Sequence, residues 1–437
     1  MTKGMLPGRV GRARNSAVDT GKGRRKGNHE GSKKMKISRA QFLSALAASA
    51  LAPLARPALA QGSVPGIDVA TKTVTIGAFT PITGPVPFYA ILTRAADAFF
   101  RHKNETGGIR GWQVRYATMD DGYEPSRSVA VTRRLVEEQG IFALVAPVGT
   151  ATNVAVIPYA REQGLPMIGP IGGASAFFTE KHVFPLLPDY GWSAAANTEH
   201  AIDGLKLQRV ALLWENDELG RSAKRGFDKY MASRNMEPAE SQSFDVRATD
   251  FTPQIRRLIS ARAEAVVMFG SNANLAAALR SASRSGFRTT WFAPFFTADP
   301  STYRLASELL DGTYFSSWLL PVGGSEPEVE AYRQSAAKYA PNDPVGVFGL
   351  NGWSNAALFA SGFERLLESG KPLTRPNLIE AMEGLTNASV GGARNVSFQP
   401  GDHRGTRQEG IIQAKDGNFS LVREFRPYPA AAFDLPT

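Results

Sequence analysis

Side chains that could make or break bonds are few in this sequence, and none shows a catalytic spacing. The chain has five histidines and no cysteine, so disulfides, thiolate metal sites and cysteine nucleophiles are excluded. The histidines are scattered, and the zinc-protease, phosphate-loop and nucleophile-elbow motifs are absent. We therefore expect no cofactor, no metal site and no enzymatic activity.

Two acidic pairs and one glycine-rich stretch are the remaining candidates for chemistry. Asp120-Asp121 precedes glycine, proline and serine residues, which favours a capping and loop-fixing role over a catalytic or metal-binding one. Asp217-Glu218 stands at the start of a predicted helix, where acidic groups complement the helix dipole. The glycines of 169–173 lack the G-x-G-x-x-G spacing, so we interpret them as a tight strand-to-helix turn.

These candidates lie at the ends of alternating strands and helices. Apolar runs such as 74–79, 141–146 and 265–269 predict buried strands separated by amphipathic helices. The alternation implies βαβ units and parallel sheets. It restarts near Trp192, and no Ser- or Pro-rich linker divides the chain. The predicted fold class is α/β, with two parallel-sheet lobes connected by several close chain crossings.

The charge distribution favours an exported chain over a nucleic-acid-binding one. Of the 50 Lys and Arg residues, 13 lie in residues 1–60 with two of the 40 acidic residues, so the remainder carries a net charge of −1. A nucleic-acid-binding protein needs its positive charge on the folded surface. Residues 35–60 combine a basic start, a short apolar run and Ala58-Leu59-Ala60, the order of a secretory signal peptide.

From this leader we expect cleavage after Ala60. Residues 1–34 are expected to be a disordered basic extension, and the alternative is that translation starts at Met35. No later stretch reaches the roughly 18 apolar residues that a transmembrane helix needs. The expected location is therefore the periplasm.

Five segments, in order, resemble the type I periplasmic solute-binding proteins of the leucine/isoleucine/valine-binding group. They are IGAFTPITGPVPFYA (76–90), GGIRGWQVRYATMDDGYEPSRSVAVTRRLV (107–136), APVGTATNVAVIPYAREQGLPMIGP (146–170), RVALLWENDELGRSAKRGF (209–227) and FDVRATDFTPQIRRLISARAEAVVMFG (244–270). The resemblance implies two doubly wound parallel-sheet lobes joined by three hinge crossings, with lobe one at 72–190 plus 322–402 and lobe two at 191–321 plus 403–437. It also implies a monomeric receptor that delivers its ligand to ABC permease subunits in the inner membrane.

The same resemblance implies a ligand site between the lobes, at the carboxyl ends of both sheets. By position, Thr150 is the hydroxyl that grips a ligand carboxylate, and a plain helix N-cap is its alternative role. Ile171 and Gly173 fall on a second carboxylate-holding turn, where the family usually has threonine in place of Gly173 and where Ser175 is the candidate substitute. The other candidate contacts are Tyr89, Leu219, Asn272, Phe295 and Phe348, the last with a role in the core as its alternative.

Two departures from the family bear on the ligand. Leu219 replaces a tyrosine, and Phe295 replaces the glutamate that anchors an α-amino group. A buried ammonium without a counter-charge is costly, so we expect a hydrophobic or aromatic organic acid. Asp217 or Asp299 could still hold an amine, which leaves an amino-acid-like solute open. A ligand-sensing module for a signalling partner and a periplasmic hydrolase are the alternative functions.

Overall fold

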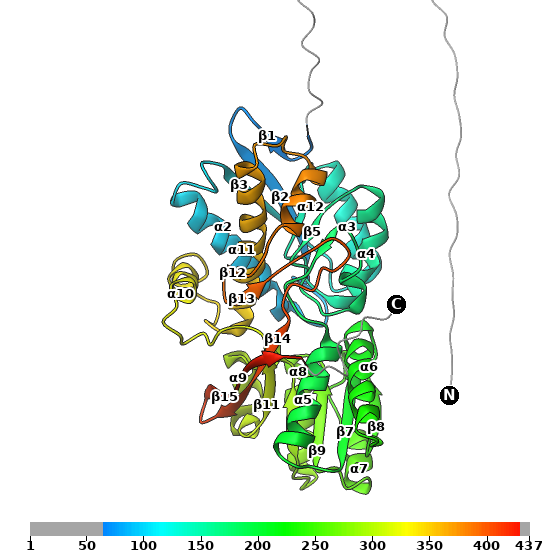
Figure 1. The fold of residues 1–437 in the computed structure, drawn as a ribbon. Helices are drawn as coiled ribbons and strands as arrows, with labels where there is room; N and C mark the ends of the chain where they lie inside the picture. The colour runs from blue at the N-terminus through cyan, green and yellow to red at the C-terminus, as the bar shows by residue number, and fades with distance from the viewer. Residues whose placement is uncertain (1–63, 429–437) are drawn as a thin grey trace, which may run out of the picture. The chain divides into compact units, whose positions relative to one another are not determined.

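The structure is a computed structural model that describes residues 64–428. The predicted basic extension and signal peptide lie outside the described residues. The described chain folds around two sheets, each with its own helices (Figure 1).

The first sheet is mostly parallel. Its parallel strands lie in the order β3-β2-β4-β5-β6, and a short strand β1 pairs antiparallel with β2. Among these parallel strands, β2 comes first in sequence and lies between β3 and β4, as in a doubly wound sheet. The switch point of the sheet is therefore between β2 and β4. The bounds are β1 Ile67–Asp68, β2 Thr73–Thr80, β3 Gln113–Asp120, β4 Leu144–Val145, β5 Met167–Ile168 and β6 Val183–Phe184.

The second sheet repeats this order. Its parallel strands lie as β8-β7-β9-β10-β11, and β14 and β15 extend the sheet antiparallel beside β11. The bounds are β7 Val210–Glu215, β8 Ser241–Phe244, β9 Ala265–Phe269, β10 Thr290–Ala293, β11 Tyr314–Ser317, β14 Gln408–Lys415 and β15 Asn418–Pro427. The two lobes thus share one topology although no residue-level repeat relates them.

Helices connect the strands of each sheet. Those of the first sheet are α2 Ala90–Glu105, α3 Pro125–Glu137 and α4 Thr150–Glu162. Those of the second are α5 Tyr190–Glu199, α6 Glu218–Ser233, α7 Thr252–Ser260, α8 Asn272–Arg284 and α9 Pro300–Ala306. A later segment holds α10 Pro327–Tyr339, α11 Val347–Glu368, α12 Arg375–Glu383 and the hairpin β12 Ala388–Val390 with β13 Ala393–Val396. Within residues 64–428, no helix has the length and apolarity of a membrane span.

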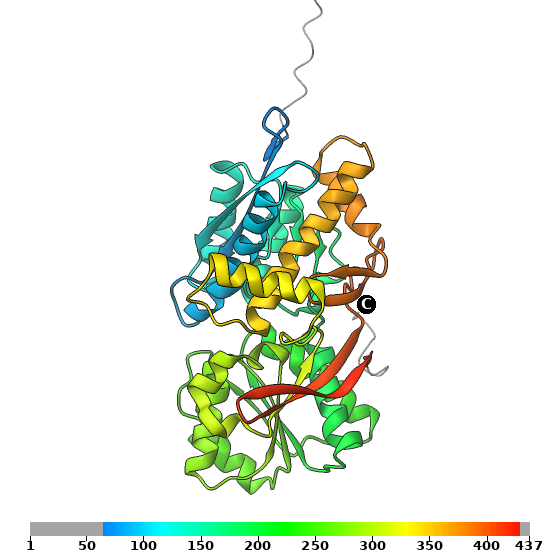
Figure 2. The same ribbon diagram turned by 90° about the vertical axis from the view of Figure 1, so that its left-hand side faces the viewer.

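The hydrophobic core is divided by sheet face. One cluster joins the first sheet to α3 and α4, and another joins the second sheet to α7 and α8. The largest cluster includes α2 and α11 on the first sheet and α5 and α6 on the second, and α11 lies beside α2 in both views (Figures 1 and 2). Hydrophobic burial is therefore continuous from one lobe to the other.

The chain passes between the two sheets three times, after β6, after β11 and after β13. The predicted fold class, two doubly wound lobes with three crossings, is confirmed. The exact lobe boundaries stay a prediction. The sequence analysis missed α9 and a 3-10 turn at Phe295–Thr297, because elements this short show no readable periodicity.

Candidate ligand-binding site

A narrow cavity lies where the carboxyl ends of strands from both sheets meet. It is lined by Tyr89, Leu92, Tyr123, Val148, Gly149, Thr150, Ile171, Leu187, Tyr190, Leu219, Phe295, Phe296, Phe348 and Asn351. Six of the nine predicted contacts are therefore brought together: Tyr89, Thr150, Ile171, Leu219, Phe295 and Phe348. The free volume is about 20 Å³, room for about one water molecule, so the walls are closed upon each other.

The amino end of α4 supplies the main group of polar atoms in this cavity. Gly149 is the N-cap, with a φ of 110° and no side-chain capping bond. The first backbone N–H groups of a helix have no partner within it, and the helix dipole gives them positive character. The side chains of Thr150 and Tyr190 both line the cavity beside these groups. The plain N-cap role for Thr150 is wrong, because Thr150 is the first residue of α4.

The turn after β5 is held against this helix start by backbone hydrogen bonds. Ile171 N donates to Pro147 O over 2.8 Å, and Gly149 N donates to Ile171 O over 2.9 Å. Gly173 lies outside the cavity lining, against Tyr190: a Cβ on it would be 2.8 Å from that ring. The tyrosine ring thus occupies the space that a threonine side chain would need at this turn.

Ser175 also lies outside the cavity lining. Its hydroxyl hydrogen-bonds to the Asp189 carboxylate, which also accepts a 2.8 Å bond from Ser222 Oγ of α6. Asp189 is the N-cap of α5 and is 4% exposed. Burial raises the pKa of Asp189, although these bonds act in the opposite direction. In the structure, Ser175 therefore connects the first lobe to the chain crossing.

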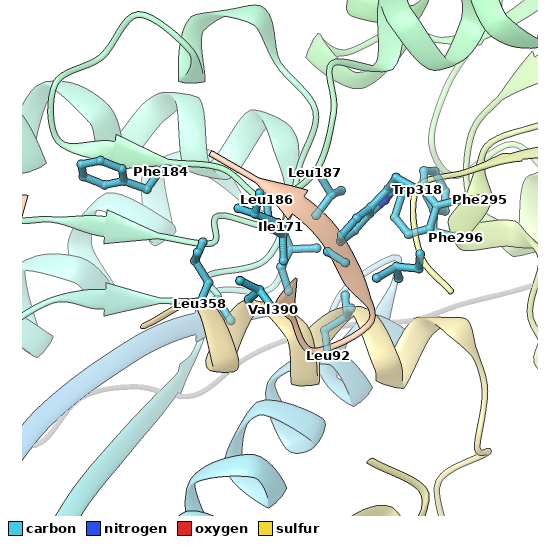
Figure 3. Packing of buried hydrophobic residues seen from close by; sticks show 14 of the residues in the cluster. Leu92, Ile171, Phe184, Leu186, Leu187, Phe295, Phe296, Trp318, Leu358 and Val390 are labelled. Atoms are coloured by element: carbon cyan, nitrogen blue, oxygen red, sulfur yellow. The ribbon is translucent and has the colours of Figure 1, made fainter. Parts of the chain in front are cut away.

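Aromatic side chains form the opposite wall. Phe295 and Phe296 follow β10 and lie close to Trp318, with Ile171 and Leu187 nearby (Figure 3). The Tyr89 ring is 5.0 Å from Phe348 and 6.5 Å from Phe296. Phe348 is 2% exposed, so it belongs to the core and to the cavity wall at once.

Asn272 lines a different hollow, which it shares with Tyr89. Its amide nitrogen donates to Thr302 Oγ1 over 2.6 Å. Asp299, the other candidate partner for an amine, accepts from Ser301 N at 3.0 Å and from Phe348 N at 3.1 Å. One carboxylate therefore holds the amino ends of α9 and α11.

No residue that lines the narrow cavity carries a formal charge at neutral pH. Glu215 and Asp217 lie behind the lining tyrosines. Burial and the neighbouring Asp217 carboxylate raise the pKa of Glu215 well above its ordinary value. Burial raises the pKa of Asp217 as well, and its side chain caps α6 through Gly220 N. The predicted helix-start role of Asp217 is confirmed.

Asp120 has the loop-fixing role that the sequence indicates. Its carboxylate accepts hydrogen bonds from the backbone N–H groups of Ile82, Thr83 and Gly122. Burial acts to raise its pKa, but these bonds and Arg127 lower it to about 2. The ionised group therefore fixes the loop that leads from β2 to Tyr89.

Sequence reasoning missed Tyr123 and Tyr190 as lining residues. Tyr123 follows the acidic pair at the carboxyl end of β3, and Tyr190 follows the α5 N-cap. Tyr123 could have been predicted, because residues just beyond the carboxyl ends of parallel strands line the cleft of such folds. Tyr190 has no such local signal, because it reaches the cavity by filling the space beside Gly173.

Comparisons with known proteins place these observations in context. Residues 73–418 match the family model described as "Periplasmic binding protein". The leucine-, isoleucine-, valine-, threonine-, and alanine-binding protein of Pseudomonas aeruginosa is 22% identical over 315 residues, which are 71% of this chain and 83% of that protein.

Two solved structures share the fold. The fatty acid ABC transporter substrate-binding protein from Thermomonospora curvata has a TM-score of 0.78 at 20% identity, covering 85% of this chain and 96% of its own. An ABC transporter solute-binding protein from Rhodopseudomonas palustris, in complex with benzoate, has a TM-score of 0.72 at 19% identity, covering 82% and 97%. Proteins of this fold are thus named for quite different ligands.

Proposed function

The chain belongs to the periplasmic binding protein family, and we propose that it is the receptor of an ABC importer for a small apolar organic acid. The importer delivers the acid across the inner membrane, and the receptor works in the periplasm after its leader is removed. The leader of residues 35–60 and the family supply the support for this location.

One observation carries the choice of ligand: the uncapped amino end of α4 opens into a cavity whose other walls are apolar or aromatic. Backbone N–H groups at a helix start bind a carboxylate without any cationic side chain. Thr150 adds a hydroxyl to them. The rings of Tyr89, Phe296 and Phe348 then enclose an apolar or aromatic body.

Ligand capture requires the lobes to open, because the closed cavity holds about 20 Å³. Hinge closure of this kind is common in periplasmic binding proteins. Closure over the ligand removes the carboxylate from water, which strengthens its hydrogen bonds. The benzoate and fatty acid named for two structural neighbours belong to the ligand class we propose.

The test is binding of benzoate and aliphatic monocarboxylates, measured by thermal shift and then by calorimetry. A ligand that binds the folded state raises the unfolding temperature. Thr150→Ala should weaken binding by about 1.5–3 kcal/mol, the contribution of a hydrogen bond to a charged group. Thr150→Ser keeps the hydroxyl and should bind nearly as well as the wild type.

Thr252→Ala is the matched control, because Thr252 is also the first residue of a helix, α7, and does not line the cavity. It should leave affinity unchanged. Equal affinity of Thr150→Ala and the wild type for the same acid would disprove the carboxylate grip. Failure of every acid to bind would reject the ligand class.

An amino-acid-like solute is the second candidate, favoured by one observation: Glu215 and Asp217 lie close enough to raise the pKa of Tyr190. An ammonium group of the ligand would favour the ionised form of this acidic pair, whose proton is released to water, and would form an ion pair with it. If leucine binds tightly, and Asp217→Asn removes that binding without affecting benzoate, the ligand carries an amine. Phe295→Glu should then improve leucine binding, whereas it should weaken binding of an organic acid.

A further inference from the structure

A second hollow adjoins the narrow cavity at Tyr89. It has a volume of about 290 Å³ and lies between the loop after β2 and the helices α8 and α9. We call it the distal crevice. Tyr89 lines both hollows, so the two hollows share this side chain as a common wall.

The distal crevice contains the amino end of α8. In the shared strand order, α8 follows the third strand of the second sheet, as α4 follows the third strand of the first. The α8 N-cap Ser271 forms a capping box with Asn274. That box leaves the first N–H groups of the helix, at Asn272 and Ala273, without a partner inside the helix, and both residues line the crevice.

A cationic side chain lies at the same place. Arg304 of α9 lines the distal crevice and is exposed. It forms no ion pair with any of the residues 64–428. The buried Asp299 carboxylate nearby is held by two backbone N–H groups. Arg304 and the start of α8 are therefore the positive groups of the crevice, and Arg304 also acts to lower the pKa of the Asp299 carboxyl against the larger effect of burial.

A buried polar atom of the crevice also lacks a partner. Asn272 is 4% exposed, and its carboxamide oxygen accepts no hydrogen bond from the described chain. A buried acceptor without a donor is costly, so this atom indicates a donor that the protein does not supply. The remaining wall is apolar, made by Val86, Phe88 and the 46% exposed Leu305.

We propose that the distal crevice is a second subsite, which binds the far acidic group of an elongated ligand whose first carboxylate lies at α4. This inference rests on the proposed function. The ligand class is an α,ω-dicarboxylic acid with an apolar middle. Its far carboxylate accepts from Arg304 and the α8 N–H groups, and a water beside that carboxylate donates to the Asn272 carboxamide oxygen.

The test compares aliphatic monocarboxylates with α,ω-dicarboxylates of the same carbon number, by calorimetry at low salt. A dicarboxylate of the right length should bind about tenfold more tightly than its monocarboxylate partner. Arg304→Gln should remove most of that advantage and leave monocarboxylate affinity unchanged, and Arg304→Lys should restore part of it. The advantage should also shrink in about 0.5 M salt, because Arg304 is exposed to solvent.

Arg288→Gln is the matched control. Arg288 is an exposed arginine just before β10, at the opposite end of the second sheet from the crevice. It should leave the affinity for both acids unchanged.

The outcomes separate this inference from the proposed function. If monocarboxylates bind but dicarboxylates of every length bind no better, the second subsite is rejected and the proposed function stands. The second subsite is also rejected if ω-hydroxy acids bind as tightly as dicarboxylates and Arg304→Gln leaves both affinities unchanged. If neither class binds, the proposed function itself fails.

Discussion

The two lobes have the same strand order, but one presents a polar helix end to the cleft and the other presents aromatic side chains. In the first lobe, the N-cap of α4 is Gly149, which has no side chain to cap the helix, and the amino end of α4 faces the narrow cavity. In the second lobe, α8 starts with a Ser271 capping box, and aromatic residues after β10 provide the cavity wall. Topology alone therefore does not fix cleft chemistry; the residues at the strand ends do.

The largest expected effect concerns a buried carboxyl of the second lobe. Glu409 on β14 accepts a 2.9 Å bond from Ser193 Oγ, and burial raises its pKa to about 8. The neutral form is favoured in the folded state, so stability should fall as the pH rises from about 4.5 to 8. Glu409→Gln should abolish this loss, so at pH 9 the free energy of unfolding of the variant should exceed that of the wild type by about 2–4 kcal/mol.

Urea denaturation of both proteins at pH 5 and pH 9 measures this difference. At pH 5 the two free energies of unfolding should be similar, because the wild-type carboxyl is then protonated in the folded state. If the difference in free energy of unfolding between the two proteins is the same at pH 5 and pH 9, the prediction is contradicted.

The uncapped start of α4 gives the next effect. Gly149→Ala should destabilise the fold by about 2 kcal/mol or more, because φ is 110° and a Cβ would be 2.3 Å from Thr152 Oγ1. The matched change in the second lobe, Ser271→Gly, should cost only a few tenths of a kcal/mol, since glycine is an acceptable N-cap. Denaturant unfolding tests both, and equal losses would remove the contrast between the lobes.

The first lobe has the opposite titration behaviour at Asp120. Its lowered pKa of about 2 means that the ionised group contributes stability above about pH 3.8, which is lost as the pH falls through 2. Asp120→Asn should be about 1 kcal/mol less stable at pH 7, after allowance for solvent screening. At pH 2 the difference should largely disappear in thermal unfolding, and its persistence there would contradict the electrostatic cause.

The smallest effect is expected where the lobes meet at the surface. Arg247 Nη2 of the second lobe lies 3.2 Å from Glu124 Oε1 of the first, and both side chains are more than half exposed. Exposed pairs contribute about 0–1 kcal/mol, so Arg247→Ala should weaken ligand affinity less than about fivefold. High salt should reduce the ligand affinity of the wild type to that of the variant, as measured by calorimetry. A loss of affinity greater than fivefold in the variant would mean that lobe closure depends on this contact.

Much of the fold could be predicted from the sequence, because some of its strands, such as β9, are short apolar runs. The predicted strand at 265–269 has the bounds of β9. The family resemblance is confirmed by the match over residues 73–418. The predicted ligand contacts stay predictions, although six of them line one cavity.

The sequence by itself determined the alternation of strands and helices, the α/β class with parallel sheets and the absence of a catalytic motif, because these depend on local periodicity and residue types. Tertiary structure alone decided which side chains meet. The Tyr190 ring fills the space beside Gly173, and the Ser175 hydroxyl bonds to Asp189. Strand order and lobe closure bring these residues together, and nothing in the sequence around them predicts the contacts.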